Sequence, residues 1–198
     1  MTAHTTLIAR NEAHAAAYSG GRPATEPTLR TMILGCADHR ADPAHVLGVA
    51  PNEAVIVRNP GGRVSPDFMR AVAVLAAVAS VEGLDTGGFE LVIMQHTDCG
   101  LSHLSPDAHA PLLAAFFDIE LSEVPAREHA DPWAAILIDV GLLAANPFMP
   151  PTLVVSGLVY DVDTGRAETV VPPTPLAELR GSRLIGARPN GRVRQSVA

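Results

Sequence analysis

The chain has 198 residues, of which 47% are hydrophobic and only 4% aromatic, and its net charge is −7. This length can bury a substantial aliphatic core, so residues 1–198 are treated as a single domain. The negative charge argues against general affinity for nucleic acid. The chain shows no signal-peptide pattern and no apolar run long enough to cross a bilayer, which predicts a cytoplasmic protein without a membrane partner.

The first 30 residues are predicted to form a helix and an arm. Residues 7–18 have the pattern of an exposed amphipathic helix, and Gly20-Gly21 ends it before a segment rich in proline and threonine.

Three short apolar runs predict strands that are buried on both faces of a parallel sheet. They span residues 31–34, 54–57 and 91–94. Each run leads into polar residues, namely Cys36, Arg58-Asn59 and His96. The carboxyl ends of parallel strands meet at one edge of a sheet, where open α/β folds bind ligands. The pattern therefore predicts a site at this edge.

Two helices are predicted to begin where a capping residue precedes a proline, at Ser65-Pro66 and at Asp131-Pro132. Their apolar stripes are expected to face the core; they consist of Phe68, Val72, Leu75 and Ala79 in the first helix, and of Trp133, Ile136, Leu137, Val140 and Leu143 in the second.

A strand over 152–160 and a turn at 161–165 lead into residues 166–171, which predicts a terminal hairpin. The expected fold is therefore α/β, with a mostly parallel central β-sheet flanked by helices and an antiparallel edge hairpin. Residues 172–198 are rich in Arg, Pro and Gly and are expected to form a solvated or subunit-contacting tail.

Both cysteines of the chain lie beside other residues that can bind or surround a metal. Cys36 begins Cys36-Ala37-Asp38-His39-Arg40, and Cys99 belongs to His96-Thr97-Asp98-Cys99-Gly100. Two thiolates and one imidazole are the set expected at a catalytic Zn²⁺ that keeps its fourth position open for water. Two inert buried cysteines, or a disulfide between them, are alternatives, although nothing in the chain indicates an oxidising compartment.

At this point the sequence resembles the β-class carbonic anhydrases, including their carbonyl sulfide hydrolase-like relatives. The family signature Cys-x-Asp-x-Arg followed by His-x-x-Cys is matched by Cys36, Asp38, Arg40, His96 and Cys99, and the resemblance covers about residues 7 to 162. It implies that Cys36, His96 and Cys99 hold Zn²⁺, that Asp38 and Arg40 form the catalytic dyad, and that the protein assembles as a homodimer or homotetramer.

The sequence departs from the family pattern at His39, Pro60 and Gln95. Pro60 stands where the family has alanine, and because proline lacks a backbone N–H, we expect the loop beside the substrate to be shaped differently.

The implied reaction is reversible hydration of carbon dioxide to bicarbonate by a zinc-bound hydroxide that the dyad orients. Two thiolates cancel the charge of the metal, so activity should favour mildly alkaline pH. His39, His103 and Asp98 could relay the released proton. The remaining histidines are interpreted as ordinary surface or helix residues; they are His4, His14, His45, His109 and His129.

Two alternatives stay open. The same ligands and dyad would serve hydrolysis of carbonyl sulfide or carbon disulfide, which relatives of the family perform. The second alternative is that the protein is a non-catalytic dimeric scaffold of the same fold. The presence of Asp38 and Arg40 argues against this alternative, because a structural zinc would not need them.

Overall fold

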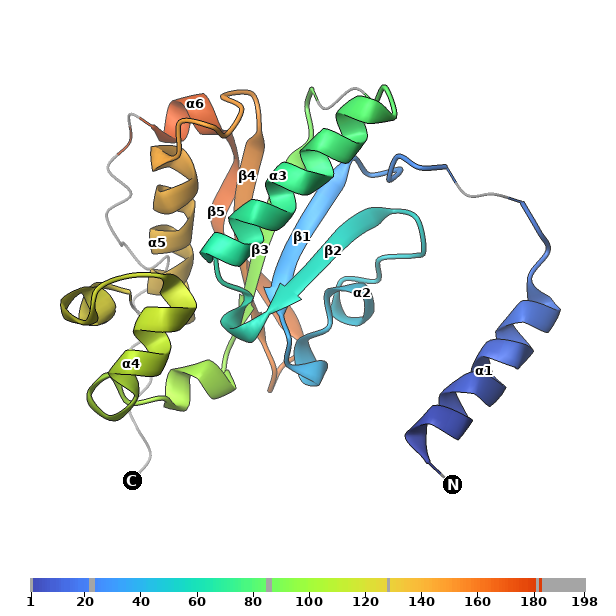
Figure 1. The fold of residues 1–198 in the computed structure, drawn as a ribbon, viewed down its shortest axis with the longest axis horizontal. Helices are drawn as coiled ribbons and strands as arrows, with labels where there is room; N and C mark the ends of the chain where they lie inside the picture. Colours follow the sequence, from blue (N-terminus) through green and yellow to red (C-terminus); the bar gives the residue numbers. More distant parts are fainter. Residues whose placement is uncertain (1, 22–23, 85–86, 128, 181, 183–198) are drawn as a thin grey trace.

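The computed structural model describes residues 2–21, 24–84, 87–127, 129–180 and 182, and its central element is a five-stranded sheet. In chain order, the helices and strands are α1 (Ala3–Ala17), β1 (Thr31–Cys36), α2 (Pro43–Val46), β2 (Ala54–Asn59), α3 (Pro66–Val81), β3 (Glu90–His96), α4 (Pro106–Phe117), α5 (Pro132–Ala145), β4 (Val154–Asp161), β5 (Arg166–Pro175) and α6 (Leu176–Leu179). The alternation of strands and helices confirms the predicted fold class (Figure 1).

The sheet has the strand order β2-β1-β3-β4-β5, and only the β4–β5 pair is antiparallel. The three predicted strands and the hairpin are therefore confirmed. The expected burial on both faces is wrong for β2, which is an edge strand whose residues are all only partly buried. The register pairs Cys36 at the end of β1 with Asn59 at the end of β2, and His96 at the end of β3 with Tyr160 on β4. The polar residues that follow the strands consequently meet at one edge, as expected.

Helices α3 and α5 begin as the sequence predicts. Ser65 Oγ accepts a hydrogen bond from the backbone N–H of Phe68, and Asp131 accepts one from the N–H of Trp133. Helix α4 was not predicted, although it uses the same device, with Ser105 capping it and Pro106 in its first turn. Its interior Pro111 obscures the helical pattern, and its buried face packs in a separate small cluster with Val124.

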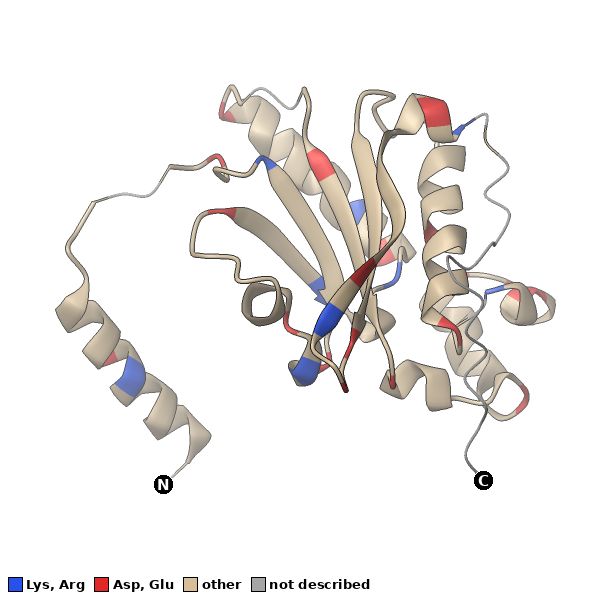
Figure 2. Ribbon diagram, turned by 180° about the vertical axis from the view of Figure 1, so that it is seen from behind, with Lys and Arg blue, Asp and Glu red and all other residues tan. Residues whose placement is uncertain are grey.

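The main core lies between one face of the sheet and helices α3, α5 and α6 (Figure 1). The opposite face is covered differently: Ile33 and Met94 are buried there, but Val92 and Leu158 are only partly buried. Figure 2 shows that, within the described part of the chain, no long helix crosses this second face. Apolar surface therefore remains on that side of a single chain.

Helix α1 begins at Ala3, earlier than predicted, because the Thr2 hydroxyl accepts a hydrogen bond from the N–H of Thr5 and caps it. None of its residues is buried, and it stands apart from the sheet (Figure 1).

Part of the predicted tail belongs to the fold, since β5 runs to Pro175 and α6 follows. Of the residues beyond Arg180, only Ser182 is described, so most of the predicted tail lies outside the described residues. In the described chain, no helix has both the length and the apolar character needed to cross a membrane.

Candidate metal centre

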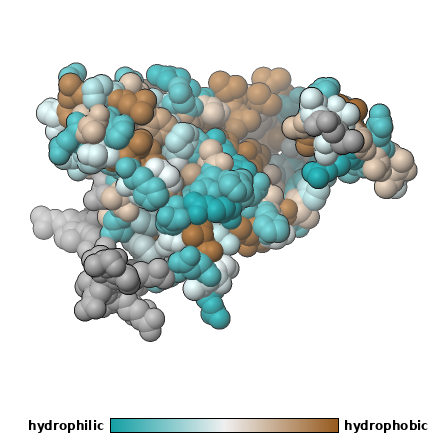
Figure 3. All heavy atoms as spheres, turned by 90° about the horizontal axis from the view of Figure 1, so that it is seen from below, coloured by the Kyte–Doolittle hydropathy of each residue, from teal (hydrophilic) through white to brown (hydrophobic). Residues whose placement is uncertain are grey.

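Cys36, His96 and Cys99 come together at the edge where β1 and β3 end. One ligand atom from each of the three lies within 4.8 Å of the others, and the two sulfur atoms are 3.8 Å apart. Figure 3 views the molecule from this side and shows hydrophilic residues gathered around its centre. The two cysteines are free, so the disulfide alternative is not the arrangement of this structure.

The His96 ring is oriented as a metal ligand would be. Nδ1 lies 2.8 Å from the carbonyl oxygen of Thr97, which can only accept, so Nδ1 carries the proton. Nε2 is then left as a lone pair, and it is buried without a hydrogen-bond partner. An orphaned buried nitrogen beside two thiols fits a divalent cation of the borderline-soft kind, such as Zn²⁺.

The thiol of Cys36 is prepared for ionisation by its surroundings. The hydrogen bond with Cys99 is the main cause that lowers the pKa of Cys36 to about 4, and the nearby His96 helps, whereas burial opposes the shift. The backbone N–H groups of Gly61 and Asp38 also point at this sulfur, at 3.2 and 3.4 Å. The same sharing of one proton raises the pKa of Cys99. Burial lowers the pKa of His96, but the Cys36 thiolate, the Thr97 carbonyl and the Asp38 carboxylate together raise it.

Asp38 and Arg40 form a close ion pair next to the sulfur cluster. Nη2 of Arg40 lies 2.7 Å from Oδ2 of Asp38, and Nε of Arg40 lies 3.1 Å from Oδ1. These bonds hold the pKa of Asp38 well below its usual range and raise the pKa of Arg40. The lowered pKa keeps the carboxylate ionised, and the side chain is 15% exposed, so it is still in contact with solvent.

Asp98 completes the environment of Arg40. Its carboxylate accepts a hydrogen bond from Arg40 Nη1 at 2.7 Å, and its backbone carbonyl accepts one from Nη2 at 2.8 Å. Asp98 adopts a φ of +53°, a left-handed conformation that aspartate occupies more readily than most other non-glycine residues. The Arg40 guanidinium beside its carboxylate lowers the pKa of Asp98.

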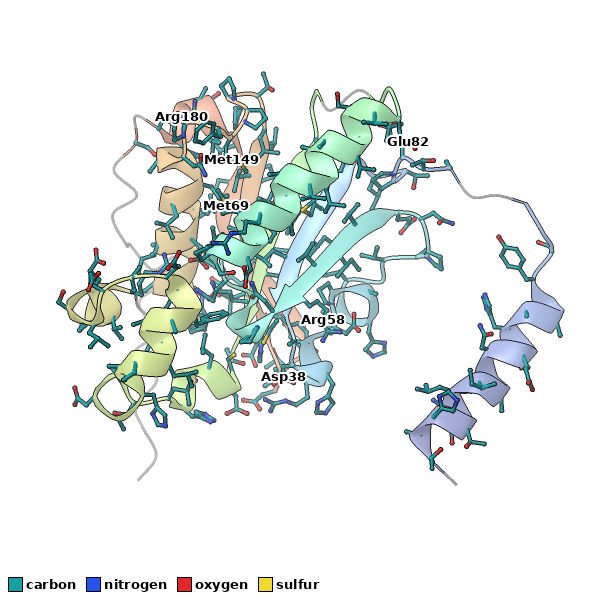
Figure 4. The ribbon with its side chains drawn as sticks, in the orientation of Figure 1. Asp38, Arg58, Met69, Glu82, Met149 and Arg180 are labelled. Carbon is teal, nitrogen blue, oxygen red and sulfur yellow. The ribbon has the colours of Figure 1, made fainter. Side chains whose placement is uncertain are left out.

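The backbone of the Cys36–Asp38 segment is held by Arg58 at the end of β2. Its guanidinium donates to the carbonyl oxygens of Cys36 and Asp38, both at 2.8 Å, and to the carboxylate of Asp42 at 2.7 Å. Figure 4 shows Asp38 and Arg58 near each other at the lower end of the sheet. Arg58 therefore fixes the turn that carries the ion pair.

Pro60 does not disturb the contact with the sulfur. The N–H that reaches Cys36 belongs to Gly61, so the donor that proline lacks is not the one used.

A narrow cavity opens beside the cluster. Its wall includes Gly61, Gln95, His96, Cys99 and Leu101, and its volume, traced by the centre of a water-sized sphere, is about 20 Å³. One water needs about 10–15 Å³ on that measure, so the cavity suits a very small substrate.

One interpretation from the sequence is wrong. His129 is buried rather than on the surface, its Nε2 lies 2.8 Å from the carbonyl oxygen of Leu104, and it lines the cavity. Nothing in the residues around it distinguishes this histidine from the exposed ones.

The sequence reasoning also missed a buried polar cluster behind the cavity. Arg63 is 1% exposed and Asp139 is fully buried, and Gln95 joins them. The available signal was an acidic residue between Ile136 and Val140 in the apolar stripe of α5.

The comparisons with known proteins agree with this geometry. Residues 31–124 match the family model for carbonic anhydrase. The "Beta-carbonic anhydrase 1" of Mycobacterium tuberculosis is 27% identical over 172 residues, which cover 87% of this chain and all of that protein. The crystal structure of carbonic anhydrase from Streptococcus mutans is 30% identical with a TM-score of 0.66, covering 86% of this chain and 98% of that one.

The chain belongs to the β-carbonic anhydrase family. The chain is also similar to proteins that are named for a different activity. The "Carbon disulfide hydrolase" of Saccharolobus solfataricus is 27% identical over 161 residues, covering 68% of this chain and 74% of that protein. Membership in the family therefore leaves the choice of substrate to the site.

Proposed function

We propose that this protein is a zinc-dependent carbonic anhydrase that hydrates carbon dioxide reversibly to bicarbonate. The observation that carries the proposal is the three-ligand cluster of Cys36, His96 and Cys99 beside an ionised carboxylate and a very small cavity. Among the described residues, the cluster contains no fourth cysteine, histidine or acidic side chain, which is the arrangement of a catalytic rather than a structural zinc.

The zinc ion, held by Cys36, His96 and Cys99, would supply an acidified water as the nucleophile near neutral pH. The chain's own part is to aim that nucleophile. Asp38 is acceptor-only because Arg40 keeps it ionised, so it accepts an O–H proton and turns the oxygen lone pair towards the substrate carbon. The dyad orients the nucleophile and needs no change of its own protonation state.

The substrate side of the cavity is small and partly apolar, with Leu101 and Pro132 in its wall. Carbon dioxide is a linear, apolar triatomic molecule and suits such a space. The glycine at 61 keeps the wall close, since a Cβ there would lie 2.5 Å from the Leu101 side chain.

The reaction also releases one proton per turnover. His103 Nε2 lies 3.5 Å from Asp98 Oδ1, and the ring is 67% exposed. His103 lines a second cavity, which shares Ser102, His129 and Ala130 with the cavity at the metal ligands. We assign His103 as the group that passes the proton to solvent. His39 is less well placed, because it is 94% exposed, lines neither cavity and lies 3.9 Å from Asp38.

Assembly as a homodimer or a dimer of dimers is part of the proposal. Helix α1 has no buried residue, and α3 exposes Val74, Val78 and Val81. Together with the partly covered face of the sheet, these surfaces support a partner subunit of the same chain. The two free cysteines support a reducing compartment such as the cytoplasm.

Hydrolysis of carbon disulfide or carbonyl sulfide is the second candidate, favoured by the similarity to carbon disulfide hydrolases. The deciding experiment is a stopped-flow assay of carbon dioxide hydration beside a sulfide-release assay with both sulfur substrates. We expect fast hydration and slow sulfide release. Hydration no faster than that of zinc in buffer would refute the proposed function, and fast sulfide release would favour the second candidate.

A further inference from the structure

Asp139 on α5 is a fully buried carboxylate that joins three separate segments of the chain. Its Oδ2 accepts from Arg63 Nε at 2.8 Å, from Gln95 Nε2 at 3.1 Å and from the backbone N–H of Val64 at 3.2 Å. Its Oδ1 accepts a hydrogen bond from Arg63 Nη2 at 3.2 Å. One side chain therefore ties α5 to the loop after β2 and to the end of β3.

The charges around Asp139 make it an expensive choice for stability alone. Nη2 of Arg127 lies 3.7 Å from Oδ1 of Asp139. The guanidinium groups of Arg127 and Arg63 both lie over the ring of Phe117, at 4.5 Å and 5.1 Å from the ring centre, respectively. Buried ion pairs are often replaceable by apolar side chains without loss of stability. A buried carboxylate shared by two guanidinium groups next to the metal ligands therefore calls for a second role.

The first connection runs from Asp139 to Cys36. Asp139 holds Arg63 and the N–H of Val64, and the Asn59 side chain closes the same loop by bonding the N–H and the carbonyl of Arg63, both at 2.7 Å. The loop presents the Gly61 N–H to the Cys36 sulfur at 3.2 Å. The position of that donor therefore depends on a loop that Asp139 anchors.

The second connection runs from Asp139 to His96. Gln95 precedes this ligand on β3, and its side chain is 3% exposed and bonded to Asp139. Because neighbouring strand residues point to opposite faces, fixing Gln95 fixes the backbone from which His96 projects. Gln95 is one of the departures from the family pattern, and its hydrogen-bond partner in this structure is Asp139.

We propose that Asp139 is a positioning residue of the metal centre, acting on Cys36 through the Gly61 loop and on His96 through Gln95. The proposal rests on the proposed metal site, and it goes beyond it by assigning a role to Asp139, which is neither one of the three proposed ligands nor part of the cavity wall. Loss of outer hydrogen bonds typically weakens metal binding or activity by about 10–100-fold. For a residue acting through another group, we expect the lower end of that range.

The test compares three variants of the full-length protein. Asp139→Asn keeps the shape but removes the charge and one acceptor oxygen. Gln95→Met cuts only the connection to β3 and leaves the Arg63–Asp139 pair in place. Ser156→Ala is the control, because Ser156 is also buried in the sheet but bonds Glu90, away from the metal ligands.

Only folded protein is used. The zinc affinity of each variant is measured by competition with a chelator, and its visible absorption spectrum is recorded after zinc is replaced by cobalt. We expect zinc affinity about tenfold weaker and an altered cobalt spectrum for Asp139→Asn, a smaller change of the same kind for Gln95→Met, and none for Ser156→Ala. A role in stability alone would leave the spectrum of a folded variant unchanged.

Wild-type zinc affinity and spectrum in folded Asp139→Asn and Gln95→Met would overturn the proposal. If Asp139→Asn does not fold, Gln95→Met decides it. This test is independent of the proposed function. A wild-type protein without hydration activity would refute that function, but its zinc affinity and cobalt spectrum could still be compared with those of the variants.

Discussion

Gly62 offers a sharp test of how closely the loop after β2 approaches the metal ligands. It has a φ of +62°, and a Cβ built on it would lie 2.7 Å from the Met94 carbonyl oxygen and 3.0 Å from the Cys36 backbone nitrogen. Both neighbours are backbone atoms of the central strands, which cannot turn aside as a flexible side chain can. Gly62→Ala should therefore push apart the ends of β1 and β3.

The magnitude follows from comparison with Gly48→Ala. Gly48 has a φ of +67° and no atom within 4 Å of a Cβ, so its replacement measures the conformational penalty without a clash. The left-handed conformation costs an L-residue about 1–2 kcal/mol, partly offset by the reduced freedom of the unfolded chain. Overpacking adds about 1–3 kcal/mol. We expect a loss of roughly 1 kcal/mol for Gly48→Ala and roughly 2–4 kcal/mol for Gly62→Ala.

Urea denaturation at one fixed protein concentration measures both free energies of unfolding, and zinc content and hydration rate are measured on the same samples. Gly62→Ala should also lose zinc or activity, whereas Gly48→Ala should keep both. If the two variants lose stability equally, within about 0.5 kcal/mol, and Gly62→Ala keeps its zinc, the close approach has no energetic consequence and the reasoning is wrong.

Four further predictions concern the site and the assembly. Protein purified without chelator should contain about one zinc per chain by metal analysis, and Cys99→Ser should lose it and fold less stably, because the metal ties two strand ends together; metal-free wild-type protein would contradict this. Asp38→Asn should keep zinc but lose about 10–100-fold in hydration rate. Because Arg40 lowers the pKa of Asp38, the ion pair should stabilise the fold above about pH 4, and this stabilisation should be lost only in stronger acid. The free energy of unfolding of the variant should therefore lack this dependence on acid pH. His103→Ala should lower kcat about tenfold or more in dilute buffer with little change in kcat/KM, and added imidazole should restore kcat. His45→Ala, at an exposed histidine, is the control and should behave like wild type. If only His39→Ala lowers kcat, His39 rather than His103 transfers the proton. Light scattering at micromolar concentration should show a dimer or tetramer that removal of residues 2–17 weakens, and a stable, active wild-type monomer would refute the assembly.

The sequence by itself determined the strands, the starts of two helices and the three residues that gather at the strand ends. Short apolar runs specify strands, and a capping residue followed by proline specifies the starts of α3 and α5, because these preferences act within a few residues. Cys36 and His96 directly end or follow such strands, so their meeting at one edge follows from parallel pairing.

The tertiary structure alone decided which other polar residues support that cluster. Arg63 and Asp139 lie 76 residues apart and pair only because α5 packs across the sheet. Local sequence patterns carry no information about such a pairing. In the sequence, Asp139 is only a polar residue within an apolar stripe, and its burial becomes understandable once the structure shows Arg63 beside it. The same reason explains His129, whose burial depends on a loop packed beside it, and Gly62, whose lack of a side chain matters only because two strand ends press against it.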